Sequence, residues 1–293
     1  MLQNCAKKAE ESILRHNRSV FIASAACVAG FWWAGLYGKM AVPSFVLLMA
    51  LFLTSLGQPL LKSLESAIPS SISTNYLSFL LELAVLDGIF TWMSAMIFGP
   101  GAVESPFAKM MEEPSALHAL AALAGAILVG DFVGYWRHRL EHSRWLWPAH
   151  EFHHGDEEMN WSTTYRFHPL NRASTTAIDM GALAMLGFPW WAIIGNSAAR
   201  HMYGLLIHAN VDWDYGRWGR IFVSPSMHRW HHADEAKAVG KNFATFFSIY
   251  DRAFGTFYAP GRRADKTGLG NGLGQDFWTS LADPLIKPFR KGG

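Results

Sequence analysis

The sequence predicts an all-α, multi-pass membrane protein with about four transmembrane helices. Of its 293 residues, 51% are hydrophobic and only 16% are charged, against about 25% charged in a typical soluble domain. Apolar runs of helical length fill the N-terminal part, and all but two of the thirteen histidines lie between His138 and His232. This composition excludes a disordered chain, a coiled coil and a disulfide scaffold. The net charge of +2 is too small to indicate a nucleic-acid partner.

Four apolar runs, residues 19–37, 40–57, 76–99 and 117–136, are the expected crossings. Each is close to the roughly 20 residues that an α-helix needs to span about 30 Å of hydrocarbon. Between residues 19 and 100 the charged side chains are Lys39, Lys62, Glu65, Glu82 and Asp87. Ionisable groups inside a membrane are functional candidates, but the sequence alone names no partner for the two acids in the third run.

A fifth apolar segment, residues 177–199, contains Pro189 and three glycines. We expect it to dip into the bilayer and return, because both of its flanks carry histidines that should share one compartment. Taken together, these patterns divide the chain into N-terminal membrane helices (1–116), a histidine-rich region (117–262) and a C-terminal tail (263–293).

The distribution of basic residues predicts the orientation. Four Lys and Arg residues lie within residues 7–18, before the first crossing, and positive flanks usually face the cytoplasm. An even number of crossings then returns the three arginines within residues 137–144 to the cytoplasm, whereas the net acidic loop 100–116 falls outside. The histidine-rich region is therefore expected on the cytoplasmic side.

Three histidine motifs are candidate sources of metal ligands. The first has the spacing HxxxH, and the second and third have the spacing HxxHH. In order, their histidines are His138 and His142; His150, His153 and His154; and His228, His231 and His232. Residues three and four apart share one face of an α-helix, so each motif aims at least two imidazoles in one direction. Pro148, and Ser224 with Pro225, precede the second and third motifs and are typical of helix N-termini.

Eight imidazoles exceed the four ligands of one zinc ion and suit two metal ions. His168 and His208 bring the number of candidates to ten, or five per ion. Nitrogen ligands accept iron, zinc or copper, so the ligand type leaves the metal open.

Two further residues are candidates for supporting roles around the metals. Asp131, seven residues before His138, is expected to accept a hydrogen bond from the second ring nitrogen of a ligand. Its alternative role is that of a buried acid paired with an arginine. His201 shares a helix face with His208 and either lines the site or contacts a lipid headgroup.

In this order and spacing, the motifs resemble those of the fatty acid hydroxylase/sterol desaturase superfamily of membrane di-iron enzymes. Supporting segments are residues 131–139 (DFVGYWRHR), 166–169 (RFHP) and 250–256 (YDRAFGT). The resemblance covers residues 120–260. Two departures are Asn242-Phe243-Ala244, where many members have Asn-Tyr-Gly, and Tyr250, where Trp is common. Neither segment contains an expected ligand.

The resemblance implies transmembrane helices topped by a cytosolic helical cap that holds two iron ions, with zinc as a substitute in purified protein. It also implies that O₂ is the co-substrate and that a C–H bond of a lipid is hydroxylated, with lipid or sterol desaturation as the alternative. No cytochrome b5 domain is fused to this chain, so a separate donor is expected: a ferredoxin, a cytochrome b5 or a flavin reductase. The compact, unfused chain looks more like a bacterial inner-membrane member than like one of the endoplasmic reticulum, so a bacterial inner membrane is the expected location.

Two interpretations from other functional classes remain. His150-Glu151-Phe152-His153-His154 fits the HExxH pattern of a membrane zinc metalloprotease, with Glu151 as general base. That pattern explains the second motif but gives no role to the histidines of the first and third motifs. A non-enzymatic membrane protein with structural zinc would hold a redox-inert metal and consume no O₂.

Overall fold

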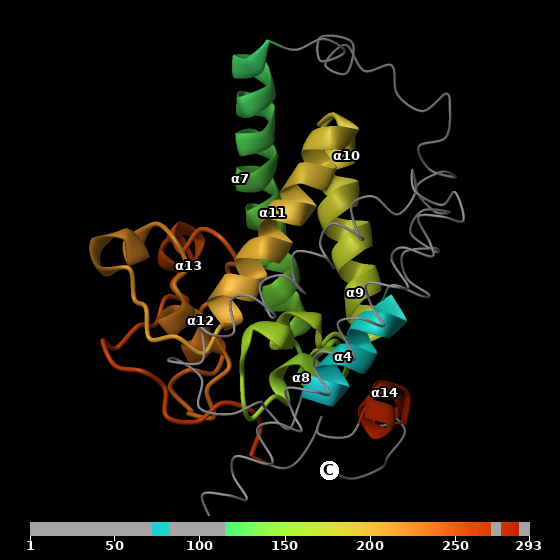
Figure 1. Cartoon of the computed structure of the whole chain (residues 1–293), viewed down its shortest axis with the longest axis vertical. Coiled ribbons are helices and arrows are strands. Elements are labelled where there is room, and N and C mark those ends of the chain that lie inside the picture. The colour runs from blue at the N-terminus through green and yellow to red at the C-terminus, as the bar shows by residue number, and fades with distance from the viewer. Residues whose placement is uncertain (1–71, 83–114, 271–276, 287–293) are drawn as a thin grey trace, which may run out of the picture. The chain divides into compact units, whose positions relative to one another are not determined.

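The computed structural model describes residues 72–82, 115–270 and 277–286. In these three ranges all regular elements are helical, and the β pairing is limited to an isolated bridge between Ala233 and Thr267. The elements are α4 (Ile72–Leu81), α7 (Ala116–Glu141), α8 (Trp147–His154), η2 (Trp161–Tyr165), α9 (Pro169–Thr175), η3 (Thr176–Met180), α10 (Gly181–Met185), α11 (Trp190–His208), η4 (Gly216–Arg220), α12 (Pro225–His231), α13 (Ile249–Ala253) and α14 (Phe277–Ile286). The expected all-α class is therefore confirmed for the described part of the chain (Figure 1).

One helix among the described residues is long and apolar enough to cross a membrane, at Leu117–Glu141 within α7. It contains the expected crossing 117–136. The expected crossings 19–37 and 40–57 lie outside the described residues, and 76–99 is described only as far as residue 82. Four crossings therefore stay a prediction.

Helix α7 is capped at its N-terminus and exposes an apolar side. The Ser115 Oγ accepts a hydrogen bond from the backbone N–H of His118 at 3.4 Å. Large apolar side chains along the helix, such as Leu117, Leu120 and Leu140, are more than half exposed. Apolar surface on this scale is unfavourable in water, and it suits contact with lipid chains.

Residues 169–208 form a helical hairpin beside α7 (Figure 1). Its first arm consists of α9, the π-helical turn η3 and α10, and its second arm is α11. The turn between them uses Gly187 at a φ of +83°, a conformation that glycine adopts without strain. The chain thus reverses direction within the segment 177–199, so that His168 and His208 lie at the two ends of the hairpin that are remote from its turn.

Small residues bring α7 and α11 close together. Ala122, Ala126, Gly130 and Gly134 recur every four residues along α7, and the two alanines are buried. A Cβ atom on Gly130 would lie 2.7 Å from the amide group of Asn196 on α11, so glycine is required for this approach. We call this contact between α7 and α11, the two longest described helices, the seam. It fixes their relative position near the ends that carry histidines.

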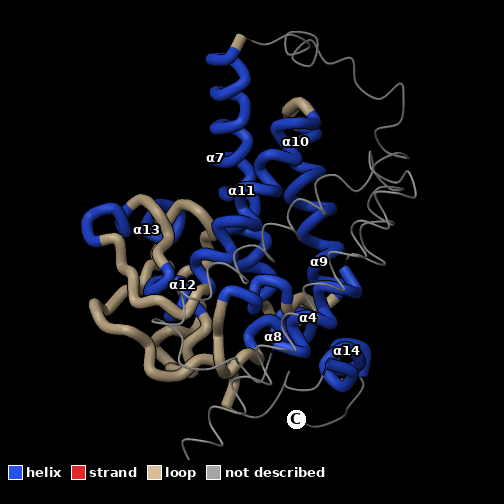
Figure 2. Tube along the Cα trace, in the orientation of Figure 1, coloured by secondary structure: helices blue, strands red, loops and turns tan. Residues whose placement is uncertain are grey.

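The remaining described chain is mostly loop around α12 and α13 (Figure 2). Its core joins Val223, Met227 and Phe243 to Tyr135 of α7 and Ile207 of α11. The C-terminal segment, expected as a tail, contributes α14, which packs against α8 through a ring contact between Phe277 and Phe152 at 6.4 Å.

Candidate metal centre

The histidine motifs lie on helices with clear N-terminal signals. Helix α8 has Pro148 at its start. Helix α12 follows Ser224, whose Oγ accepts a hydrogen bond from the backbone N–H of Met227 at 3.1 Å, and it begins with Pro225. The first motif occupies the last turn and the C-cap of α7. The expected helical placement of all three motifs is therefore confirmed.

Nine of the ten predicted ligands form two groups in which the candidate ligand atoms lie within 4.8 Å of one another. Site A consists of His138, His142, His150, His154 and His231. Site B consists of His153, His208, His228 and His232. The two sites adjoin, because the ring of His154 in site A stacks on that of His232 in site B with centroids 4.4 Å apart.

Helical spacing explains how the motifs are divided. In each motif the two histidines four residues apart stay in one site, because one helix face carries both. The first and second motifs supply such a pair to site A, and the third supplies one to site B. The remaining histidine of each HxxHH motif crosses over, His153 to site B and His231 to site A. His208, the last residue of α11, completes site B.

Backbone carbonyl groups fix the orientation of several rings. The Nδ1 atoms of His138, His208 and His231 each lie 2.7 Å from a carbonyl oxygen, of Phe243, Gly204 and Lys241 respectively. His153 Nδ1 makes the same kind of contact with the Arg166 carbonyl at 3.2 Å. A carbonyl oxygen only accepts, so each Nδ1 carries the proton and each Nε2 keeps its lone pair free for a metal.

The unprotonated Nε2 atoms of neighbouring histidines face one another at short range. His153 Nε2 and His208 Nε2 are 3.3 Å apart, and both rings donate through Nδ1. His138 Nε2 lies 3.0 Å from His150 Nε2, and the Nδ1 of His150 contacts Asn171 Oδ1 at 3.2 Å. Two neutral imidazoles in this arrangement repel, and a cation between them removes the repulsion.

Burial keeps the histidines uncharged. It lowers the pKa of His231 to about 3 and that of His208 to about 4. Burial, reinforced by the neighbouring histidines, holds the pKa of His153, His154 and His232 well below the usual range. Several buried ring nitrogens, including His231 Nε2 and both nitrogens of His232, have no hydrogen-bond partner within the described chain. Neutral, buried and unpartnered nitrogens are what transition-metal ions require, so both sites fit a metal.

Two carboxylates anchor the loop that orients site A. Asp131 accepts hydrogen bonds from the backbone N–H groups of Thr245, Phe246 and Phe247 at 2.7–3.2 Å. Asp251 accepts from the two preceding N–H groups of this loop, those of Phe243 and Ala244, at 2.7 and 3.0 Å. The same loop presents the carbonyl oxygens that hold His138 and His231.

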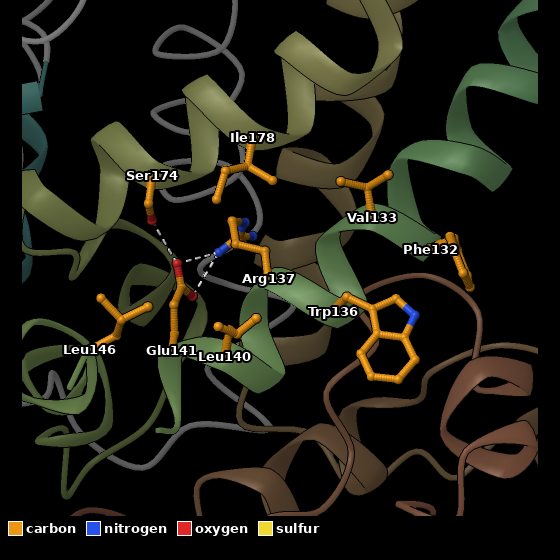
Figure 3. A pocket seen from close by; sticks show the side chains of 9 residues that line it. All are labelled: Phe132, Val133, Trp136, Arg137, Leu140, Glu141, Leu146, Ser174 and Ile178. Atoms are coloured by element: carbon orange, nitrogen blue, oxygen red, sulfur yellow. Dashed lines mark hydrogen bonds and ion pairs between the residues drawn. The ribbon is translucent and has the colours of Figure 1, made fainter. Parts of the chain in front are cut away.

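An ion-pair network lies beside site A and lines a pocket of about 290 Å³ (Figure 3). Arg137 contacts Glu141 at 2.6 Å and Asp179 at 2.8 Å, and Glu141 also accepts from Ser174. Glu141 Oε2 lies 3.7 Å from His150 Nδ1. Because Glu141 separates the pocket from His150, this carboxylate forms the boundary of site A.

Three predicted site residues lie outside both histidine groups. His168 caps α9: its Nδ1 accepts from the backbone N–H of Leu170 at 3.1 Å, and its Nε2 lies 3.0 Å from the Leu281 carbonyl. His201 packs against Tyr165, with ring centroids 5.2 Å apart. Asp131 approaches Arg200 at 3.6 Å and holds backbone N–H groups, so it acts one step further from the histidine groups than expected.

The sequence interpretation missed four residues that orient the sites. Glu141 and Asn171 contact His150, Phe243 presents its carbonyl to His138, and Asp251 holds Phe243. Asp251 lies in the segment 250–256 that supports the family resemblance, and Glu141 lies within the first motif. Their sequence neighbourhood therefore carried a signal, but their partners are 8 to 105 residues away in the chain.

Comparison with known proteins points to one family. Residues 123–256 match the model of the fatty acid hydroxylase family. Ornithine lipid hydroxylase OlsE of Rhizobium tropici is 31% identical over 167 residues, which are 56% of this chain and 50% of that protein. Alkylglycerol monooxygenases of Homo sapiens and Danio rerio are each 34% identical, over 46% and 45% of this chain and 30% and 29% of their own lengths. The resemblance to the superfamily is thereby confirmed.

The matched region spans half or less of each of these relatives. No solved structure matches the chain.

Proposed function

We propose that this chain, whose residues 123–256 carry a fatty acid hydroxylase region, is a membrane-bound di-iron oxygenase that hydroxylates a C–H bond of a lipid. The observation that carries the proposal is the convergence of the three motifs and His208 on two adjoining all-histidine sites. The relatives are a hydroxylase of ornithine lipid and monooxygenases of alkylglycerol, which supports hydroxylation and a lipid with a polar headgroup as substrate.

Two iron ions would be held by the five histidines of site A and the four of site B. Such an iron pair supplies O₂ activation: with two electrons and two protons, C–H and O₂ become C–OH and water. The electrons require a separate protein donor, for which a ferredoxin, a cytochrome b5 and a flavin reductase are the candidates. Zinc also fits these nitrogen ligands and is expected in some preparations.

The protein's own contribution is to orient ligands and exclude water. Carbonyl groups hold the ring nitrogens of His138, His153, His208 and His231 in the tautomer that presents Nε2 to a metal. All nine ligands except His142 are buried, so bulk water is kept from the reacting centre. The apolar exposed side of α7 suits entry of a lipid from the bilayer, with the sites on the cytoplasmic side of a bacterial inner membrane.

The proposal is tested by replacing one ligand of each site, with His231→Ala for site A and His153→Ala for site B. Removing even an outer partner of a ligand typically costs roughly 10–100-fold, so each variant should lose at least that much O₂-dependent lipid hydroxylation. His118→Ala is the control, because His118 lies at the start of α7 and contacts Ser115. Wild-type activity in the His153 or His231 variant would contradict the assignment.

The reaction type is read from the lipid products of cells with and without the gene. Hydroxylation adds one oxygen atom to a lipid, whereas desaturation removes two hydrogen atoms.

Glu151→Gln tests the protease alternative, since a zinc protease of the HExxH type would lose nearly all activity with its general base. His150 and His154 share site A with three further histidines, more than the two histidines that such a protease takes from its motif.

A further inference from the structure

Three buried polar atoms near site B lack a hydrogen-bond partner within the described chain. They are the Tyr165 hydroxyl, His201 Nε2 and Arg172 Nε. They come from three elements, η2, α11 and α9, and none belongs to a metal site. An unsatisfied buried donor or acceptor costs free energy, so three of them in one neighbourhood indicate a missing partner.

The three side chains are neighbours and adjoin site B. The rings of Tyr165 and His201 have centroids 5.2 Å apart, and the charge of Arg172 acts on both groups. The Arg172 guanidinium lies 4.7 Å from the ring centroid of Phe167, and that ring stacks on His153 of site B at 4.3 Å. A short chain of contacts therefore links the cluster to a metal ligand.

The cluster carries no net charge. Burial, followed by the nearby positive charge of Arg172, lowers the pKa of His201 to about 3. Burial also raises the pKa of Tyr165 above its usual value. Arg172 is paired with Glu82 at 2.7 Å, so its charge is balanced, and its buried Nε–H has no partner within the described chain. A hydroxyl, an Nε–H and a neutral imidazole favour a ligand that offers an acceptor oxygen.

We propose that Tyr165, His201 and Arg172 bind an uncharged acceptor oxygen in the polar part of the lipid substrate: a carbonyl, ether or hydroxyl oxygen. This inference rests on the proposed function and adds a recognition site to it. His201 precedes His208 by seven residues on one helix, about 10 Å at 1.5 Å per residue. The bound oxygen would thus fix how far along the lipid the reactive C–H lies from the headgroup.

The test is a binding measurement on the metal-free full-length protein in lipid nanodiscs. The probes are 1-monopalmitoylglycerol, which offers ester and hydroxyl oxygens, and n-heptadecane, which offers none. Tyr165→Phe and His201→Leu should each weaken monopalmitoylglycerol binding roughly tenfold, the size expected for one lost hydrogen bond, and leave heptadecane binding unchanged. Tyr203→Phe is the matched control, since its hydroxyl already donates to the Val223 carbonyl at 2.8 Å.

A second readout separates recognition from a structural role. Because the Tyr165 hydroxyl is unpartnered, Tyr165→Phe should leave the melting temperature of the ligand-free protein unchanged or raise it. Unchanged binding in both variants would overturn the inference, and would mean that buried water alone satisfies these atoms. A lower melting temperature with unchanged binding would overturn it in favour of a structural role.

The binding arm needs neither metal nor turnover, so it fails independently of the proposed function. A tenfold loss of binding in the variants, together with absent O₂ uptake in iron-loaded wild-type protein, would keep the recognition site and reject the oxygenase. The reverse pattern would keep the oxygenase and reject the site.

Discussion

At the scale of single residues, the sites depend on the protonation of imidazoles. The rings of His138, His153, His208 and His231 donate through Nδ1 to carbonyl oxygens, which leaves Nε2 unprotonated. Protonation of Nε2 would place charged rings within 3.0–3.3 Å of their neighbours. The metal-free protein therefore holds these side chains in the neutral form. A low pH favours their protonation and so lowers the stability of the folded state.

We predict that the metal-free protein loses stability as the pH falls below about 6.5. The pKa of His231 is about 3 in the folded chain against 6.5 when unperturbed, so below pH 6.5 the unfolded chain binds more protons. The free energy of unfolding should fall by about 1.4 kcal/mol per pH unit for each such histidine, down to its folded pKa. Thermal melting between pH 7.5 and pH 5.5 measures this.

The metal-loaded protein is the comparison for this measurement. A bound metal competes with protons for Nε2, so its melting temperature should decline less over the same range. Identical curves with and without metal would show that the histidines do not bind it.

At the scale of elements, the seam between α7 and α11 sets the separation of the motifs. Gly130 meets the side chain of Asn196, and Gly134 meets that of Arg200. On the C-terminal side of the seam, α7 with its C-cap supplies two candidate ligands, His138 and His142, to site A, and α11 supplies His208 to site B. Close approach of the two helices is therefore a condition for the two sites to adjoin.

We predict that Gly130→Ala destabilises the protein by about 1–3 kcal/mol, because its Cβ would lie 2.7 Å from the buried amide of Asn196. Gly181→Ala is the matched control: this helical position has no neighbour within 4 Å, and the change should stabilise by about 0.4–1 kcal/mol. Thermal unfolding with metal analysis of both variants checks the pair. Equal stability of the two variants would refute the role of the seam.

At the scale of the whole described molecule, the two histidine groups bring together helices that are distant in sequence. Site A draws ligands from α7, α8 and α12 with its flanks, and site B from α8, α11 and α12 with its flanks. Ligand residues 138 to 232 are thus joined in one cluster. A metal at either site restrains all of these elements at once.

We predict that removing the metals with a chelator lowers the melting temperature by several degrees and that restoring iron or zinc reverses the loss. A ligand at 100 times its Kd stabilises the folded state by about 2.7 kcal/mol per site. Calorimetry before and after chelation measures the change. An unchanged melting temperature would indicate that the histidine groups do not hold metal in the folded protein.

The sequence predicted all nine histidines that the structure gathers into the two groups, with His168 as a tenth that lies outside them, but not the surroundings that orient them. Spacing of three and four residues on helices predicts that His150 and His154, or His228 and His232, act together, because helix geometry is local. The partition into two sites, the anchoring of residues 243–247 by Asp131 and Asp251, and the position of His168 as a helix cap depend on tertiary contacts. No local pattern encodes such contacts.

The interleaving of the second and third motifs has a consequence for assembly. Each HxxHH motif serves both sites, so an ion that settles in one of them draws into place the helix turns that form the other. Metallation should then be cooperative, with empty and doubly filled molecules in excess over singly filled ones at substoichiometric metal. A lineage that lost either HxxHH motif would lose candidate ligands from both sites in one step.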